Sequence, residues 1–284
     1  MATLVRTEEE TLLADMARGF LDEKAPVTHL RKLRDAGRTH DADLWAEMAG
    51  MGWAGVLIPE ELGGSDMGHA AAGVLATEMG KTLAASPFLS TAVIAATALR
   101  QVADDRANSS LRAIAEGART YALAIDEGPK FAPDNTALEA RAEGNGFRLT
   151  GRKTFVVDGG FADRLLVLAK TEGGLTLFDL PSDRDGVTRE ARAMIDSRDA
   201  ARIDFADVEA TGEDVLGQVD NAMTVLRPAL EAGQVALAAE MSGLAAGAFG
   251  MTVGYLKERK QFGMLIGQFQ ALQHRAADLW CQTM

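Results

Sequence analysis

The sequence predicts an α+β protein in which two helical regions flank a β region. Apolar residues at helical spacing dominate residues 1–118, and alternating apolar residues with turn dipeptides dominate residues 119–218. An Ala/Gly-rich helical pattern dominates residues 219–284. We therefore expect an N-terminal helical domain, a middle antiparallel β domain and a C-terminal helical domain, in that order.

The N-terminal region carries clear signals of helix starts and breaks. Thr7 and Glu10 have the spacing of a capping box, in which each side chain accepts a hydrogen bond from the other residue's backbone N–H. Pro59 and the Gly63–Gly64 pair interrupt the helical pattern, and a helix over about 69–83 follows. The apolar face of the first helix is predicted to consist of Leu12, Leu13, Met16 and Phe20.

Short strands separated by tight turns are predicted for the middle region. Asn145–Gly146 lies between two alternating runs, which is the strongest short-range signal for a β-hairpin. Leu165–Ala169 has the pattern of a buried strand, the Gly173–Gly174 pair turns the chain, and a further alternation covers Ala201–Phe205. This succession is typical of an antiparallel sheet.

A long helix is predicted over about 222–258, where alanine and glycine recur many times. Each interior glycine costs a helix about 1 kcal/mol relative to alanine. Small residues let helices approach closely, so we expect this helix to pack tightly against its neighbours. A sharp turn at Phe262–Gly263 and a second helix from about Phe269 follow it.

Composition and charge argue against several classes of protein. The formal net charge of -12 disfavours non-specific binding to nucleic acid or to anionic membranes. Cys281 is the only cysteine and the four histidines are scattered, so we expect no intrachain disulfide and no metal site. We see no secretory signal and no stretch both long and apolar enough to span a membrane. A cytoplasmic protein without a nucleic-acid partner is expected.

One segment near the end of the chain, Arg259–Arg275, resembles a known family signature. Its Arg259-x-Gln-Phe-Gly and Phe269–Gln270 portions are similar to the signature of the acyl-CoA dehydrogenases, which in that family binds FAD across a subunit interface. The resemblance implies the family's fold, with a C-terminal helical bundle that is truncated here because its last helices would lie beyond Met284. Further segments that resemble the family, in the same order along the chain, are Leu44–Gly64, Ser86–Phe88, Gly151–Gly159 and Asp196–Asp199.

The resemblance also implies an FAD site at this signature. Arg259 would hold the pyrophosphate through its planar guanidinium, with Gln261, Phe262 and Gln270 as the other cofactor-binding residues. The alternative for Arg259 is an exposed side chain, because the helix dipole favours a cation at a helix C-terminus.

The β region contributes two more residues to the implied flavin site. Phe155 matches the position whose aromatic ring covers one face of the flavin, although a strand core residue is the alternative. Val157 matches a position that often carries Ser or Thr, and valine offers no hydroxyl. Residues 121–131 depart from the family's loop for flavin and thioester, so Asp126 and Glu127 are interpreted as turn residues.

The catalytic base is the part that the sequence does not supply. The base must reach the α carbon of the substrate, and in some family members it lies 26 residues before the signature arginine, where this chain has Gly233. Glu231 would face away, whereas Glu240 lies on the same helix face about 10.5 Å further along and is kept as a candidate. A paired or exposed charge is the alternative for Glu240. Either the sequence is a piece of a longer protein, or the chain is a partner subunit that lacks the base or the flavin.

The predicted function is FAD-dependent α,β-dehydrogenation of an acyl-CoA thioester, with an electron-transfer flavoprotein reoxidising the FAD. We expect a homo- or hetero-oligomer with an acyl-CoA dehydrogenase subunit. One alternative is a non-catalytic partner that completes another subunit's flavin site, and another is a related flavin oxidase or monooxygenase. Ala232, Gly233 and Ala236 suggest room for a bulky acyl chain.

Overall fold

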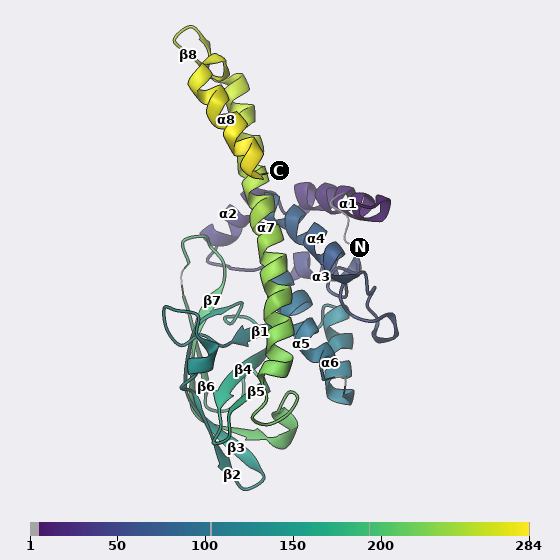
Figure 1. The fold of residues 1–284 in the computed structure, drawn as a ribbon, viewed down its shortest axis with the longest axis vertical. Helices are drawn as coiled ribbons and strands as arrows, with labels where there is room; N and C mark the ends of the chain where they lie inside the picture. Colours follow the sequence, from purple (N-terminus) through teal and green to yellow (C-terminus); the bar gives the residue numbers. More distant parts are fainter. Residues whose placement is uncertain (1–5, 103, 193, 284) are drawn as a thin grey trace.

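The computed structural model describes residues 6–102, 104–192 and 194–283. In Figure 1, helices α1 and α3–α6 lie on one side of the long helix α7, α2 and most of the β sheet lie on the other, and α7 continues beyond them into a projecting arm. The chain therefore has the predicted α+β class, with helices, sheet and helices in that order. The domain boundaries at residues 118 and 218 stay predictions.

The first helix begins as its sequence predicts and buries part of the predicted apolar face. The Glu10 N–H donates to Thr7 Oγ1 at 3.1 Å, and the Thr7 N–H donates to Glu10 Oε2 at 2.9 Å, which confirms the capping box. Leu13 is buried and Phe20 packs against the core as predicted, whereas Leu12 and Met16 are exposed beside the face that packs on α4. That buried face consists of Leu13, Ala14, Ala17 and Leu21. The helices are α1 (Glu8–Lys24), α2 (Val27–Asp35), α3 (Ala42–Gly50), α4 (Gly68–Thr82), the π-helical η2 (Phe88–Ala95), α5 (Ala96–Arg100) and α6 (Asp105–Ala115).

The β region forms one seven-stranded sheet with the order β1-β4-β2-β3-β7-β6, and β5 pairs with β4. It differs from the purely antiparallel sheet that was predicted, because β1 pairs with β4 in parallel and β2 meets β4 in parallel at Glu139. The β2–β3 hairpin and the connection after it lie between β1 and β4, so β4 can return in the direction of β1. The strands are β1 (Tyr121–Ala124), β2 (Glu139–Glu143), β3 (Gly146–Val157), β4 (Arg164–Lys170), β5 (Leu175–Pro181), β6 (Val187–Ala191) and β7 (Ala200–Thr211).

The predicted hairpin is present, with its turn one residue earlier than expected. Glu143 pairs with Gly146, so the loop is Gly144–Asn145 rather than Asn145–Gly146. Gly144 has a φ of 58°, which glycine adopts without strain. The glycine that fits the positive φ therefore sets the position of the turn.

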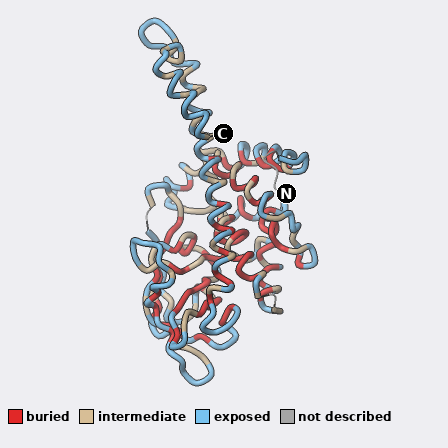
Figure 2. Tube along the Cα trace, in the orientation of Figure 1, coloured by how far each residue is buried: buried red, intermediate tan, exposed pale blue. Residues whose placement is uncertain are grey.

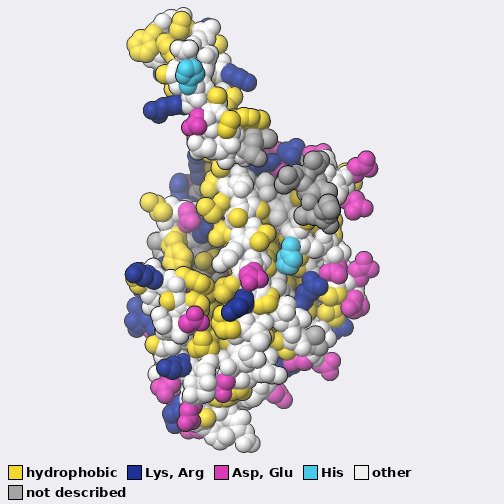
Figure 3. Space-filling view, in the orientation of Figure 1, with side chains coloured by type: hydrophobic (Ala, Val, Ile, Leu, Met, Phe, Trp, Pro, Cys, Tyr) yellow, Lys and Arg dark blue, Asp and Glu magenta, His cyan; other side chains and the backbone are white. Residues whose placement is uncertain are grey.

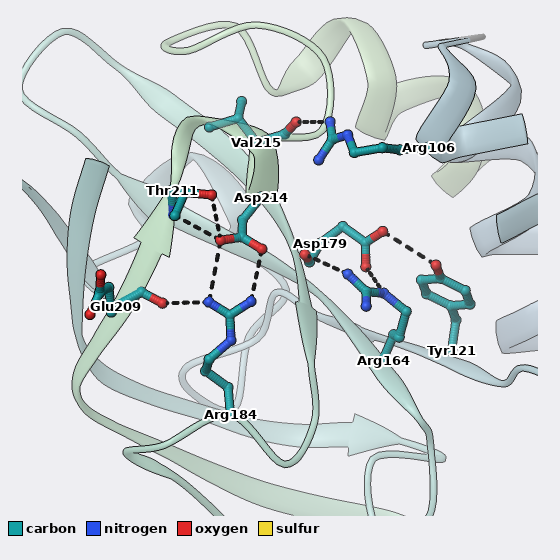
Figure 4. Close-up of polar contacts among 9 residues, drawn as sticks. All are labelled: Arg106, Tyr121, Arg164, Asp179, Arg184, Glu209, Thr211, Asp214 and Val215. Atoms are coloured by element: carbon teal, nitrogen blue, oxygen red, sulfur yellow. Dashed lines mark hydrogen bonds and ion pairs between the residues drawn. The ribbon is translucent and has the colours of Figure 1, made fainter. Parts of the chain in front are cut away.

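Partly buried ion pairs tie the sheet to the segments around it (Figure 4). The Arg164 Nε donates to Asp179 Oδ1 at 2.7 Å, and the Tyr121 hydroxyl donates to Asp179 Oδ2 at 3.2 Å. Arg184 donates to Asp214 at 2.9 Å, close to the segment that leads into α7. These contacts join β1, β4 and β5 and fix the point from which α7 departs.

Helix α7 (Met223–Glu258) crosses α4 in the close contact that its small residues predict. A Cβ atom on Gly243 would lie 1.9 Å from the Thr77 carbonyl oxygen, and one on Gly80 of α4 would lie 2.0 Å from the Glu240 carbonyl oxygen. Both distances are far below any van der Waals contact. Glycine at both positions lets the two backbones meet.

The arm consists of the end of α7, the hairpin of β8 (Lys260–Gln261) and β9 (Met264–Leu265), and α8 (Gln270–Thr283). Figure 2 shows that it is almost entirely exposed, and no residue of α8 is buried. Hydrophobic side chains gather along α7 and at the tip of the arm (Figure 3). The large exposed ones in these elements include Met241, Met251, Tyr255, Phe262, Leu279 and Trp280.

Helix α7 also corrects the expectation that no stretch is long and apolar enough to span a membrane. It has 36 residues, and its most apolar window of 18 residues has a mean hydropathy of 1.3. Its apolar character was missed because it is spread over alanine and methionine rather than a run of long aliphatic side chains. Length and composition are weak evidence for a span, because a helix that packs in a bundle meets the same criterion.

Candidate functional site

A cavity of about 570 Å³ lies where the helical region, the sheet and α7 meet. Its walls come from α4 and the loop after it, the end of β3, the loop between β6 and β7, and α7 between Ala236 and Leu244. Most of the lining is apolar, and the polar exceptions cluster around Asp158 and Arg198. Concave apolar sites with a few convergent polar groups are typical of small-molecule binding.

Phe155 lies in this cavity on strained backbone. The β3–β7 register slips between Lys153 and Val156, and Phe155 in this bulge has a φ of 53°. Its side chain is 54% exposed, so the alternative of a strand core residue is wrong. A bulky residue in the left-handed region is strained, and such strain is concentrated at functional sites. Val157 lines the same cavity and offers no hydroxyl to a ligand.

Asp158 follows these residues and is a buried carboxyl that sequence reasoning missed. The Ser90 hydroxyl of η2 is its hydrogen-bond partner, and its backbone N–H donates to the Asp199 carbonyl at 3.2 Å. Burial raises the pKa of Asp158 to about 7, opposed by the Ser90 hydrogen bond and reinforced by the charge of Asp199. Asp199 itself accepts hydrogen bonds from Thr39 at 2.9 Å and the Gly160 N–H at 2.7 Å.

Glu240 also lines the cavity, and it forms an ion pair with Arg198. Arg198 comes from the predicted turn between β6 and β7, so the pair joins the sheet to α7. The side chain of Glu240 is 13% exposed and that of Arg198 is 40% exposed. The paired charge foreseen as the alternative for Glu240 is therefore present, with a partner from the sheet region.

The other positions weighed for a base do not reach the cavity. Glu231 is exposed on α7. A Cβ on Gly233 would lie 2.8 Å from Ile94 Cγ1, so η2 fills the space that the small residues suggested for a bulky acyl chain. Of the three residues behind that suggestion, Ala236 alone lines the cavity.

The signature residues lie together at the arm, far from the cavity. Arg259, Gln261 and Gln270 are exposed there, and Phe262 is 92% exposed. Phe262 has a φ of 53° and Gly263 a φ of 80°, so a phenylalanine occupies a turn position that favours Asn, Asp or Gly. Arg259 is 19 residues beyond Glu240 on one continuous helix, which separates them by about 28 Å along its axis.

The loop after β1 is ordered by a buried ion pair rather than by simple turn chemistry. The Lys153 ammonium, which is fully buried, donates to Glu127 Oε1 at 2.7 Å. Glu127 also accepts from the Ala137 and Leu138 N–H groups at 2.7 and 2.9 Å. Burial acts to raise the pKa of Glu127, but these hydrogen bonds leave it below its usual value. Glu127 is thus the anchor of this loop.

No group of three or more His, Cys, Asp or Glu side chains that could hold a metal ion exists among the described residues. The chain therefore has two candidate places for a ligand, the cavity that contains the strained Phe155 and the exposed arm.

Comparison with known proteins identifies the family. The chain matches the models of the acyl-CoA dehydrogenase N-terminal domain over residues 7–118 and C-terminal domain over residues 223–284. It is 32% identical over 274 residues to the acyl-CoA dehydrogenase IpdE2 of Mycobacterium tuberculosis, an alignment that covers 96% of this chain and 71% of the relative. The chain belongs to the acyl-CoA dehydrogenase family. This confirms the family that the sequence motifs predict.

Other relatives of this chain are parts of complexes. The caffeyl-CoA reductase–Etf complex subunit CarC of Acetobacterium woodii is 27% identical, over 96% of this chain and 75% of that relative. Among solved structures, the Tcur3481–Tcur3483 steroid ACAD is 33% identical with a TM-score of 0.87, over 97% of this chain and 74% of that chain. The ChsE4–ChsE5 complex of Mycobacterium tuberculosis is 26% identical with a TM-score of 0.88, over 99% and 76%.

Members of the family are flavoprotein oxidoreductases, and this chain has residues that suit FAD at two separate places. The half-exposed ring of Phe155 and the apolar cavity suit the flavin ring, whereas the exposed Arg259 and the protruding Phe262 suit the phosphates and an aromatic face. The separation along α7 exceeds the distance between the ring and the pyrophosphate of one FAD molecule. A single copy of this chain therefore offers two half-sites.

Proposed function

We propose that this chain is a subunit of an FAD-dependent acyl-CoA dehydrogenase that forms a double bond between the α and β carbons of an acyl-CoA thioester. FAD supplies the hydride acceptor, and an electron-transfer flavoprotein reoxidises it. The residues of this chain bind and orient the FAD and the acyl-CoA, because the cofactor performs the difficult chemistry. The direction of the reaction is part of the proposal, since some relatives are named reductases.

The observation that carries this proposal is the pair of strained phenylalanines, one in each half-site. Phe155 lies in the cavity with a φ of 53°, and Phe262 lies at the tip of the arm with the same φ. Neither ring contributes to the hydrophobic core, so folding alone does not explain them. In the proposed assembly, Phe155 of one subunit and Arg259, Gln261, Phe262 and Gln270 of another contact one FAD molecule.

The cavity is the proposed location of the reacting part of the acyl group. Most of its lining is apolar, and Asp158 is neutral below a pH of about 7. The Glu240 carboxylate is paired with Arg198 and is not a free carboxylate in the cavity. A cytoplasmic location follows from the electron-transfer partner proposed here.

The experiment that tests the proposal is a visible absorption spectrum of the purified protein with FAD, before and after anaerobic addition of acyl-CoA. Bound flavin that substrate bleaches supports a complete dehydrogenase. Bound flavin that no acyl-CoA bleaches contradicts catalysis by this chain and supports the second function below. An absence of flavin binding, also when a partner subunit is present, would overturn the proposal.

The second function is a non-catalytic partner in a heteromeric dehydrogenase. Two observations favour it. The carboxylates that line the cavity in the described residues are paired or hydrogen-bonded. Val157 lacks the hydroxyl often found at its position in the family. Such a chain would contribute its arm to the FAD of another subunit. Turnover of any acyl-CoA by this chain alone would exclude this role.

A further inference from the structure

We infer that the cavity binds an acyl group that carries a neutral oxygen, a hydroxyl or a ketone, and that Arg198 and Glu240 recognise this oxygen. The inference rests on the function proposed above, because it takes the cavity to be the place of the acyl chain. It concerns the chemical class of the substrate, which the family alone leaves open.

The first argument is the hydrogen-bonding capacity of Arg198. A guanidinium has five N–H donors. Among the described residues, its hydrogen bond to a side chain is the one to Glu240, and the Asp196 carboxylate lies 3.9 Å from its Nε, beyond hydrogen-bonding distance. The side chain of Arg198 lines the cavity and is 40% exposed, so it is accessible there to water or to a ligand. A purely apolar chain that displaced this water would leave the donors unsatisfied, which is unfavourable.

The second argument is the charge around the pair. Arg198 is the sole cation among the residues that line the cavity in the described part of the chain, whereas the acidic side chains there are Asp158, Asp196, Asp199 and Glu240. A carboxylate on the acyl chain would meet an arginine that is already neutralised, with further negative charge beside it. A neutral oxygen avoids this repulsion.

The third argument is that one hydroxyl satisfies both members of the pair. It can accept a hydrogen bond from Arg198 and donate one to Glu240, and a ketone can accept from Arg198. An ion pair in an apolar cavity contributes little to stability, because well-packed apolar side chains commonly replace such pairs at no cost. A site built to bind a substrate oxygen strongly rejects the analogue that lacks it. Recognition of a substrate oxygen therefore explains the position of this ion pair in the cavity, whereas stability does not.

The test is equilibrium binding of matched CoA thioesters to the full chain, together with any subunit that copurifies with it. The probes are octanoyl-CoA, octanoyl thioesters that carry one hydroxyl or one ketone at successive carbons beyond the β carbon, and suberyl-CoA as the carboxylate analogue. We expect one or more of the oxygenated neutral thioesters to bind about tenfold more tightly than octanoyl-CoA, as one good hydrogen bond to a charged group gives. Suberyl-CoA should bind no more tightly than octanoyl-CoA.

The decisive variant is Arg198→Met with Glu240→Leu, which removes both charges and keeps similar volumes. It should bind octanoyl-CoA and lose the preference for the oxygenated thioesters. The matched control is Arg148→Met with Glu143→Leu, which removes an ion pair of 2.7 Å at the β2–β3 hairpin and should keep the preference. Equal binding of all thioesters by the unmodified protein, or a preference that survives in the Arg198/Glu240 variant, would overturn the inference and leave the proposed function standing. Binding of no acyl-CoA at all would overturn both.

Discussion

The contact between α4 and α7 gives the sharpest test of how this sequence determines its fold. We predict that Gly243→Ala destabilises the protein although alanine is the better helix former. The new Cβ would lie 1.9 Å from the Thr77 carbonyl oxygen, whereas ordinary contact begins at 3.4 Å. The helices must therefore separate by about 1.5 Å, the difference between these distances, or distort locally. Overpacking of this kind costs up to about 3 kcal/mol.

The gain in helix propensity offsets about 1 kcal/mol of this cost, which leaves a net loss of about 2 kcal/mol. For a chain of this size the loss corresponds to a melting temperature roughly 4 °C lower. The matched control is Gly19→Ala in α1, where a Cβ would meet nothing within 4 Å and where we expect a gain of up to about 1 kcal/mol. Thermal unfolding followed by circular dichroism measures both. If Gly243→Ala were as stable as Gly19→Ala, the argument that close backbone contact requires this glycine would be refuted.

Three further predictions concern the sites. Phe262→Ala should leave the melting temperature unchanged, because the Phe262 ring is 92% exposed. The same substitution should weaken FAD binding in the assembled protein by about 1–3 kcal/mol, measured by flavin fluorescence. Unchanged FAD binding would contradict the role of the arm. The pKa of Asp158 is raised from 3.8 to about 7, so the folded state keeps a proton that the unfolded state releases, and stability should fall as pH rises from about 4 to 7. Asp158→Asn should remove this part of the pH dependence in urea unfolding, and an identical profile would count against a buried neutral carboxyl. Lys153→Met should cost about 3 kcal/mol by leaving Glu127 partly buried without its cation, whereas Lys130→Met at an exposed position should change stability by less than about 0.5 kcal/mol.

Features that depend on neighbours in the sequence could be predicted well. The capping box needs only residues Thr7 and Glu10, and the turn at Phe262–Gly263 needs only a short segment around a glycine. The hairpin was displaced by one residue because two adjacent signals competed, and Gly144 rather than Asn145 took the positive φ. Residues close in the sequence therefore predicted where these elements begin or turn to within one residue.

Features that depend on contacts between distant residues could not be predicted. Arg198 and Glu240 are 42 residues apart, and Lys153 and Glu127 are 26 residues apart, so neither pair has a signature in the sequence. The strain at Phe155 comes from a slip in register against β7, which a single strand pattern does not reveal. The Arg198–Glu240 pair and Phe155 line the cavity, so the fold was more predictable than its site.

The geometry of α7 explains why the two half-sites cannot combine within one chain. Glu240 in the cavity and Arg259 at the arm belong to one unbroken helix, whose hydrogen-bonded backbone holds them about 28 Å apart. Gly80 and Gly243 fix this helix on α4 on the cavity side, so the arm cannot fold back without breaking either the helix or that contact. In the assembly that we propose, the arm that meets this cavity therefore belongs to a second subunit, because α7 holds the chain's own arm away from it.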